Sequence, residues 1–290
     1  MFEGLKQEKI KTSGAVINLV HGGEGPALLL LHGYPQTHAM WHKVAPRLAR
    51  DFTVVCADLR GYGESSKPAS TPDHFPYSKR ASAQDMVEVM ASLGFDRFAI
   101  AGHDRGGRVA HRMVLDHEPR VIKAAVLDIV PTHKIFAATN KAIATGYYHW
   151  FFLIQAHDLP EHLIGLDPDY YLKRKLGQWS AGMDAFAPEA LAEYARCFRD
   201  PKTIHATCED YRAAASIDLA HDEADMGREP KTPLLALWGK KGLMDRHFDV
   251  LATWRERFQD VRGEALDCGH FLPEEQPEQT HRAMRDFFAN

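Results

Sequence analysis

Residues 102–107 read Gly-His-Asp-Arg-Gly-Gly (GHDRGG), and the sequence around them sets the architecture of the chain. The apolar run RFAIA at 97–101 precedes them, and RVAHRMVLDH at 108–117 has helical spacing. A strand, a polar residue between glycines and a helix predict a nucleophile elbow, a sharp turn that exposes its central side chain. That central residue is usually serine, and here it is Asp104.

Short apolar runs alternate with amphipathic stretches on both sides of this turn. Strands are expected at 15–20, 26–33, 52–58, 97–104, 124–130, 233–239 and 263–270. Further helices are expected at 82–93, 247–258 and 277–288. This alternation predicts a mostly parallel sheet that is covered by helices on both faces.

The alternation stops between residues 131 and 228. This stretch is rich in aromatic residues and helical patterns, it is punctuated by prolines, and it offers no convincing strand. We therefore expect a core domain formed by residues 1–130 and 229–290, with a helical cap at 131–228 inserted into it.

The composition limits the possible functions. A chain of 290 residues that is 45% hydrophobic can bury a large core. A net charge of −4 argues against a nucleic-acid partner, because such proteins usually present a strongly basic face. The four cysteines are scattered without metal-ligand spacing, so we expect reduced thiols and no metal site. No segment has the length of a membrane span or the pattern of a signal peptide, which favours a cytoplasmic protein without a membrane partner.

Three further loops follow predicted strands, where open α/β sheets bind their ligands. They are LHGYP at 31–35, DLRGYGESSKP at 58–68 and DCGHFLPEEQP at 267–277. Together with the elbow, these loops resemble, in order and spacing, those of the α/β-hydrolase superfamily: an oxyanion loop, a glycine-rich turn and the loop of the catalytic histidine. The resemblance implies an α/β-hydrolase fold with a cap.

An aspartate nucleophile points to attack on a saturated carbon. A serine that displaced a halide would leave a stable ether, whereas Asp104 leaves an ester that activated water can cleave. Carbon–halogen bonds and epoxides are the two obvious targets. The alternative for Asp104 is a helix-capping role without catalysis. The helix N-terminus favours the ionised carboxylate, and the backbone N–H groups of Tyr34 and Arg105 are candidates to hold the oxyanion of the second step.

The attacking water needs a base, and His270 stands where the superfamily keeps its histidine. The acid that orients this histidine often lies three residues after the glycine of the WG at 238–239, but Gly242 occupies that place. Asp128, at the end of AAVLDIV, is the preferred candidate, and Asp245 is the second choice.

Two arginines follow Asp104 in the first turn of the predicted helix. Arg105 and Arg108 are three residues apart and share one face. Cations are unfavourable at a helix N-terminus, so a ligand would explain them better than solvent exposure. We expect them to hold a substrate carboxylate by charge-assisted hydrogen bonds, of which the bidentate form is one arrangement, and so to offset its repulsion from Asp104.

A departing halide needs hydrogen-bond donors. YYHW at 147–150 supplies the imidazole of His149 and the indole of Trp150 from one part of the cap, and CEDYRAA at 208–214 supplies the phenol of Tyr211 from another. From the residues alone, the preferred interpretation of these three side chains is that they are core residues of the cap, as aromatic residues in a helical cap usually are.

Asp104, Arg105, Arg108, Asp128, His149, Trp150, Tyr211 and His270 together resemble the site of the fluoroacetate (haloacetate) dehalogenase family. That resemblance implies hydrolysis of a small anionic haloacid, with water, to glycolate and halide through an aspartyl ester. It assigns the arginines to the carboxylate and the cap trio to the halide, and it implies a homodimer without a cofactor. Tyr34 is expected to form part of the pocket wall.

Other functions remain open at this point. An epoxide hydrolase shares the aspartate, histidine and acid, but it needs two cap tyrosines and has no charge for the arginines to hold. A haloalkane dehalogenase typically has tryptophan where this chain has Arg105. A non-catalytic receptor would not need an aligned base and nucleophile, and an esterase would need a serine in the elbow.

Overall fold

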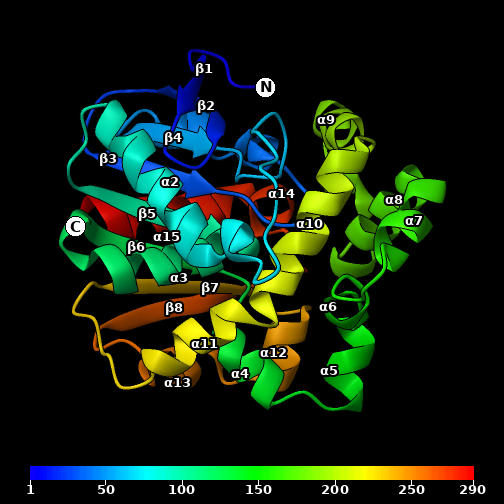
Figure 1. The fold of residues 1–290 in the computed structure, drawn as a ribbon. Coiled ribbons are helices and arrows are strands. Elements are labelled where there is room, and N and C mark those ends of the chain that lie inside the picture. Colours follow the sequence, from blue (N-terminus) through cyan, green and yellow to red (C-terminus); the bar gives the residue numbers. More distant parts are fainter.

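One sheet of eight strands forms the centre of the protein, and the computed structural model describes residues 1–290. The strand order is β1-β2-β4-β3-β5-β6-β7-β8 (Figure 1). Only the pairs β1/β2 and β2/β4 are antiparallel. The strands are β1 (Lys6–Lys11), β2 (Val16–Gly22), β3 (Ala27–Leu31), β4 (Thr53–Ala57), β5 (Phe98–His103), β6 (Val121–Leu127), β7 (Leu234–Gly239) and β8 (Val261–Leu266). The predicted mostly parallel sheet is confirmed.

Burial explains which strands the sequence reveals. Every residue of β3 and β5 is buried, as expected for central parallel strands covered on both faces. Strand β3 is apolar throughout, and β5 is apolar apart from its last residue, His103. Strand β1 was not predicted. It reads KQEKIK, lies at the edge of the sheet and buries only Ile10, so its charged residues hide the strand pattern.

Helices flank the sheet, and four of them correspond to the helices predicted at 82–93, 108–117, 247–258 and 277–288. The core helices are α1 (Ala45–Leu48), α2 (Lys79–Ser92), α3 (Arg105–His117), α12 (Leu243–His247), α13 (Val250–Arg255), α14 (Leu272–Glu275) and α15 (Pro277–Ala289). The helix expected near 247–258 is α13, which is shorter than expected, and α12 directly before it was not predicted. The Asp249 carboxylate accepts a hydrogen bond from the N–H of Ala252 at 2.9 Å and so caps a new helix.

Eight helices lie in sequence between β6 and β7, and the stretch contains no strand. They are α4 (Thr132–Ala137), α5 (Lys141–Gly146), α6 (Tyr148–Phe152), α7 (Leu159–Leu166), α8 (Pro168–Trp179), α9 (Pro188–Phe198), α10 (Pro201–Ala214) and α11 (Ile217–Ala224). Figure 1 shows α5 to α9 to one side of the sheet, with α10 between them and the strands. The limits of the cap, 131 and 228, stay a prediction.

The carboxyl ends of the parallel strands position the candidate site. Asp104 follows β5, Asp128 follows β6, and His270 follows β8 after a short loop. Parallel strands bring these ends to the same edge of the sheet, where α/β folds collect their functional residues. No helix of the protein is both long and apolar enough to span a bilayer.

Candidate active site

Asp104 lies at the sharp turn between β5 and α3. Its backbone has φ 45° and ψ −111°, a strained conformation for a residue with a side chain. The turn depends on small neighbours: a Cβ atom on Gly106 would lie 2.5 Å from the carbonyl oxygen of His32. The Asp104 side chain makes no capping hydrogen bond to α3. A helix-capping role is therefore not what holds this aspartate in place.

The Asp104 carboxylate faces hydrogen-bond donors and positive charge. Its Oδ2 accepts a hydrogen bond from the backbone N–H of Tyr34 at 3.0 Å. Burial by itself raises the pKa of Asp104, but the charges of His270, Arg105 and Arg108 outweigh burial and hold that pKa below its usual value. Asp104 is therefore ionised at neutral pH.

His270 and Asp128 form a buried pair. The Nδ1 atom of His270 lies 2.6 Å from Oδ2 of Asp128, and Oδ1 of Asp128 accepts the N–H of Gly239 at 2.9 Å. Burial lowers the pKa of His270, but the hydrogen bond and charge of Asp128, together with the charge of Asp104, more than reverse this and raise it. Asp128 thus fixes the tautomer that leaves Nε2 of His270 free to accept a proton.

The structure separates the two candidate acids. Asp245 accepts a hydrogen bond from Nε1 of Trp238 at 2.8 Å and is not the partner of His270. A Cβ atom on Gly242 would lie 3.4 Å from Oδ1 of Asp128. The Asp128 carboxylate therefore fills the space beside residue 242, although it comes from a different strand.

Arg105 has one nitrogen without a partner. The side chain is fully buried, its Nε donates to Oδ2 of Asp210 at 2.7 Å, and its Nη2 donates to the carbonyl oxygen of Asp210 at 2.8 Å. Nη1 is buried without a hydrogen-bond partner. The Nε and Nη2 edge of the guanidinium is therefore occupied within the protein, and a bidentate fork from that edge to a ligand is excluded.

Arg108 is held differently. Its Nη1 donates to the carbonyl oxygen of Val130 and to the hydroxyl of Thr132, both at 3.0 Å, while its Nε is buried without a partner. The guanidinium carbon lies 4.7 Å from the centroid of the Trp150 ring, and that of Arg105 lies 4.1 Å from the centroid of Tyr211. Each arginine is thus stacked on an aromatic residue and keeps one unpaired buried donor.

His149, Trp150 and Tyr211 come together from α6 and α10. Nε2 of His149 lies 3.1 Å from the Tyr211 hydroxyl, and the ring centroids of Trp150 and Tyr211 are 6.1 Å apart. Burial, followed by the charges of Lys175 and Arg105, lowers the pKa of His149 well below its usual value, so the imidazole is neutral. The neutral imidazole of His149 has one N–H and the phenol of Tyr211 has one O–H. The hydrogen bond between them uses one of these two protons, so the other remains for a ligand.

Tyr34 forms part of the wall around this group. The ring is fully buried, lies parallel to that of His149 at a centroid distance of 6.1 Å, and meets Tyr211 edge-on at 5.3 Å. Its hydroxyl is buried without a partner. The backbone N–H of Tyr34 therefore contacts Asp104, whereas its ring packs against His149 and Tyr211.

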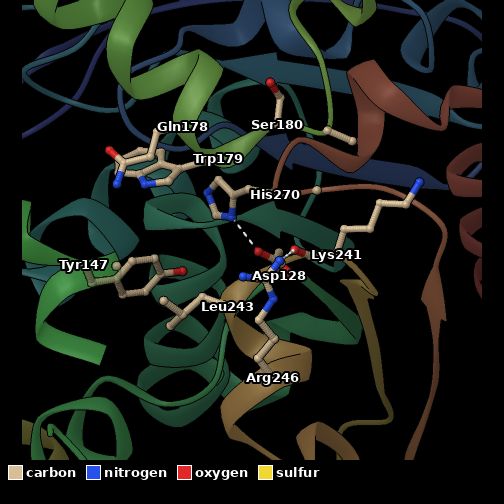
Figure 2. Close-up of a pocket in the computed structure, with 13 residues that line it drawn as sticks. Asp128, Tyr147, Gln178, Trp179, Ser180, Lys241, Leu243, Arg246 and His270 are labelled. Carbon is tan, nitrogen blue, oxygen red and sulfur yellow. Dashed lines mark hydrogen bonds and ion pairs between the residues drawn. The ribbon is translucent and has the colours of Figure 1, made fainter. Parts of the chain in front are cut away.

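A cavity of about 370 Å³ lies against His270 and Asp128. Figure 2 shows His270 between the ring of Trp179 and the Asp128 carboxylate. The other lining residues come from the stretch between β6 and β7, from the loop after β7 and the α12 helix that follows it, and from Gly269. They include Tyr147, Gln178, Lys241, Gly242 and Arg246. Asp104, the two arginines and the halide candidates do not line this cavity, and all of them are buried. No cluster of His, Cys, Asp and Glu side chains is arranged to hold a metal ion.

Sequence reasoning missed three residues of this site. Asp210 holds Arg105, Trp179 packs 4.5 Å from His149 and 5.7 Å from His270 between ring centroids, and Lys175 is fully buried beside aromatic rings. Burial lowers the pKa of Lys175 to about 7. Asp210 directly precedes Tyr211, but an acid in a helix usually faces solvent, so its type and position gave no signal.

Residues 26–277 match the sequence pattern of the family described as alpha/beta hydrolase fold. The chain therefore belongs to the α/β hydrolase family. A solved chain from Nostoc sp PCC 7120 that is described as an alpha/beta hydrolase superposes with a TM-score of 0.99 at 60% identity, covering 100% of both chains. The eight-stranded, mostly parallel sheet flanked by helices is the fold of this family.

Two curated relatives bear on the activity. A fluoroacetate dehalogenase of Burkholderia sp is 48% identical over 291 residues, which cover 100% of this chain and 96% of the relative. A soluble epoxide hydrolase of Corynebacterium sp. (strain C12) is 33% identical over 281 residues, covering 96% of this chain and 95% of the relative. The chain is similar to hydrolases of both kinds, and the first similarity is the greater.

Proposed function

We propose that the protein is a hydrolytic dehalogenase of small haloacids such as fluoroacetate, which it converts to glycolate, halide and a proton. One observation carries this proposal: the buried carboxylate of Asp104 lies among the charges of two arginines, and each arginine keeps an unpaired buried donor. Unpaired buried donors are costly unless a ligand accepts from them. The 48% identity to a fluoroacetate dehalogenase supports the same conclusion.

In the first step, an Asp104 oxygen attacks the carbon that bears the halogen. The carbon–halogen bond breaks, its electron pair leaves with the halide, and an ester joins Asp104 to the substrate. Arg105 Nη1 and Arg108 Nε would each donate one hydrogen bond to the substrate carboxylate. Trp150 and the one polar proton that the His149–Tyr211 hydrogen bond leaves free would donate to the halide as its charge develops.

In the second step, His270 removes a proton from water, and the water oxygen adds to the carbonyl carbon of the ester. The backbone N–H of Tyr34, which contacts Asp104 Oδ2, would donate to the oxyanion. The tetrahedral intermediate releases glycolate and restores the Asp104 carboxylate with one oxygen from water. Asp128 stabilises the imidazolium until it gives its proton to the departing glycolate oxygen. The new carboxyl group of Asp104 then loses the remaining proton of the water to solvent, which is the net proton of the reaction.

The cavity beside His270 offers a route for an anionic substrate and for water. Arg246 lines it without a carboxylate partner and would attract an anion from solution, whereas Lys241, which also lines it, pairs with Asp267 at 3.1 Å. Trp179 and Tyr147 line its cap side. His270 borders this cavity, so water reaches the base without crossing the arginine pair.

An epoxide hydrolase is the second candidate. Such an enzyme needs two cap phenols near the nucleophile. Tyr147 lines the cavity with Asp128 and His270, and the Tyr211 ring covers the guanidinium of Arg105, the residue after Asp104, at 4.1 Å, so both phenols lie in the site. The 33% identity to a soluble epoxide hydrolase favours the same reading. Against it, an epoxide would leave the arginine donors unpaired.

Fluoride release from fluoroacetate, measured with a fluoride-selective electrode, tests the proposal. Chloroacetate, a neutral haloalkane and a neutral epoxide would be run beside it, with Asp104→Asn as the inactive variant. Fluoride release that requires Asp104, with the haloalkane and the epoxide untouched, is the expected result. Opening of the epoxide without halide release from any haloacid would replace the dehalogenase with the second candidate.

We also propose that the protein acts as a homodimer. Leu159, Leu163 and Leu166 are exposed and follow helical spacing along α7, so they form an apolar stripe that a second copy would cover. Light scattering of the wild type and of Leu163→Asp gives the test, with a monomeric wild type as the contrary result.

A further inference from the structure

The structure assigns to Asp210 the role of a positioning residue that determines which nitrogen of Arg105 is presented to the substrate carboxylate. This inference rests on the proposed function, because it takes Arg105 as a ligand for that carboxylate. Asp210 belongs to α10 of the cap, whereas Arg105 begins α3 of the core. The substrate carboxylate would thus be held by an arginine whose orientation the cap controls.

The contacts restrict Arg105 to a single orientation. Asp210 binds it twice, by its side chain at Nε and by its main-chain carbonyl at Nη2, so rotation about the last bonds of the arginine would break both hydrogen bonds. The Tyr211 ring covers one face of the guanidinium at 4.1 Å. Nη1 is the only nitrogen left without a partner, and it is buried.

Asp210 is itself fixed from the core. Its Oδ2 also accepts the Tyr62 hydroxyl at 2.8 Å, and its Oδ1 pairs with Nζ of Lys79. Burial alone raises the pKa of Asp210, but the charges of Arg105 and Lys79 outweigh it and hold the pKa well below its usual value. The carboxylate is therefore ionised throughout the working range, and its oxygens are held by donors from two core segments.

The same helix turn serves both ends of the substrate. Asp210 directs Arg105 toward the carboxylate, and the next residue, Tyr211, contacts His149 at the halide corner. A shift of α10 would therefore displace both groups together. Because misplacement of a positioning group by about 1 Å can cost roughly 10²-fold in rate, the register of this one turn determines how well a short haloacid fits.

The chain provides a matched control. Asp218 also pairs with Lys79, with its Oδ2 lying 3.5 Å from Nζ, and its Oδ1 accepts the backbone N–H of Lys79 at 2.9 Å. It belongs to the same buried charge cluster, but it makes no contact with Arg105. Asp218→Asn therefore perturbs the cluster without releasing the arginine.

The test measures binding of acetate by isothermal titration calorimetry for wild type, Asp210→Asn, Asp210→Ala and Asp218→Asn. We expect Asp210→Ala to bind acetate at least about tenfold more weakly, because the loss of a charge-assisted contact frees Arg105 to rotate. Asp210→Asn keeps an oxygen for Nε and should bind with intermediate affinity. Asp218→Asn should match the wild type.

A kinetic readout separates positioning from a general loss of structure. The KM for chloroacetate should rise in Asp210→Ala relative to the KM for neutral chloroacetamide, whereas a merely structural role would change both alike. Wild-type acetate affinity in folded Asp210→Ala, or equal losses in Asp210→Asn and Asp218→Asn, would overturn the inference. If Asp210→Ala does not fold, the comparison of Asp210→Asn with Asp218→Asn tests the inference.

Acetate binding needs no turnover, so the two proposals can fail separately. If no haloacid releases halide while acetate affinity still depends on Asp210, the dehalogenase proposal fails and the role of Asp210 stands. If halide is released but acetate affinity does not depend on Asp210, the dehalogenase proposal stands and the role of Asp210 fails.

Discussion

The Asp128 carboxylate lies 2.6 Å from Nδ1 of His270, although the two residues follow different strands and are 142 positions apart. The second oxygen of Asp128 accepts the N–H of Gly239 at 2.9 Å, which fixes the plane of the carboxylate. The pair is therefore a preorganised base for the water of the second step, ester hydrolysis.

Asp128→Asn should stop the cycle after its first half. Asparagine keeps the shape, but it no longer stabilises the imidazolium or fixes the productive tautomer, so ester hydrolysis should slow by roughly 10³-fold or more. Chloroacetate should then give a burst of about one halide per active site, and mass spectrometry should find the ester on the peptide that contains Asp104. Asp245→Asn is the control and should turn over like the wild type. Steady turnover in Asp128→Asn would contradict the assignment.

The pH dependence should differ between the free enzyme and the ester. His270 acts as a base only when neutral, so hydrolysis fails as the pH falls through its pKa. In the free enzyme, Asp128 and Asp104 raise that pKa. Esterification removes the Asp104 charge, so the acid limb of ester hydrolysis should lie at lower pH than the His270 titration seen by NMR in the free enzyme. An acid limb at the same pH or higher would argue against this base.

The source of oxygen should reveal the nucleophile. In a single turnover in ¹⁸O-labelled water with enzyme in excess, the label should enter Asp104, because water attacks the carbonyl carbon of the ester. The first glycolate should be unlabelled, since its hydroxyl oxygen comes from the aspartate. Label in that glycolate would mean direct attack of water on the substrate.

The halide corner should matter most for the poorest leaving group. Trp150→Phe removes the indole N–H but keeps a ring beside Arg108, whose guanidinium stacks on it at 4.7 Å. The loss of one such donor should slow fluoroacetate turnover by roughly 10²-fold, and bromoacetate should be affected much less because bromide leaves readily. Equal losses on both substrates, measured as initial rates of halide release, would assign Trp150 to packing alone.

The elbow should tolerate no side chain at Gly106. An added Cβ atom would lie 2.5 Å from the carbonyl oxygen of His32 and 2.6 Å from that of Leu31, and both are backbone atoms. Gly106→Ala should therefore lower the free energy of unfolding by roughly 1–3 kcal/mol or more. Gly165→Ala in α7 is the matched control, because nothing lies within 4 Å of its added Cβ; it should leave stability unchanged or raise it by up to about 1 kcal/mol. Urea denaturation curves of both variants provide the measurement.

The sequence by itself determined the elbow, the order of its loops and the mostly parallel sheet. These features depend on short-range rules: glycines are required where backbones approach closely, as at Gly106, and buried parallel strands such as β3 must be apolar throughout. The same rules explain why β1 escaped notice, since an edge strand with charged residues carries little apolar pattern.

Only the tertiary structure decided which charged groups pair with one another. Nothing local indicates that Asp210 binds Arg105 from 105 positions away, or that this leaves Nη1 as the free nitrogen. Nor does any motif place Trp179 between His149 and His270. Such contacts arise where the helices between β6 and β7 pack against the rest of the chain, and packing is set by the sum of many distant contacts rather than by the residue types within any one segment.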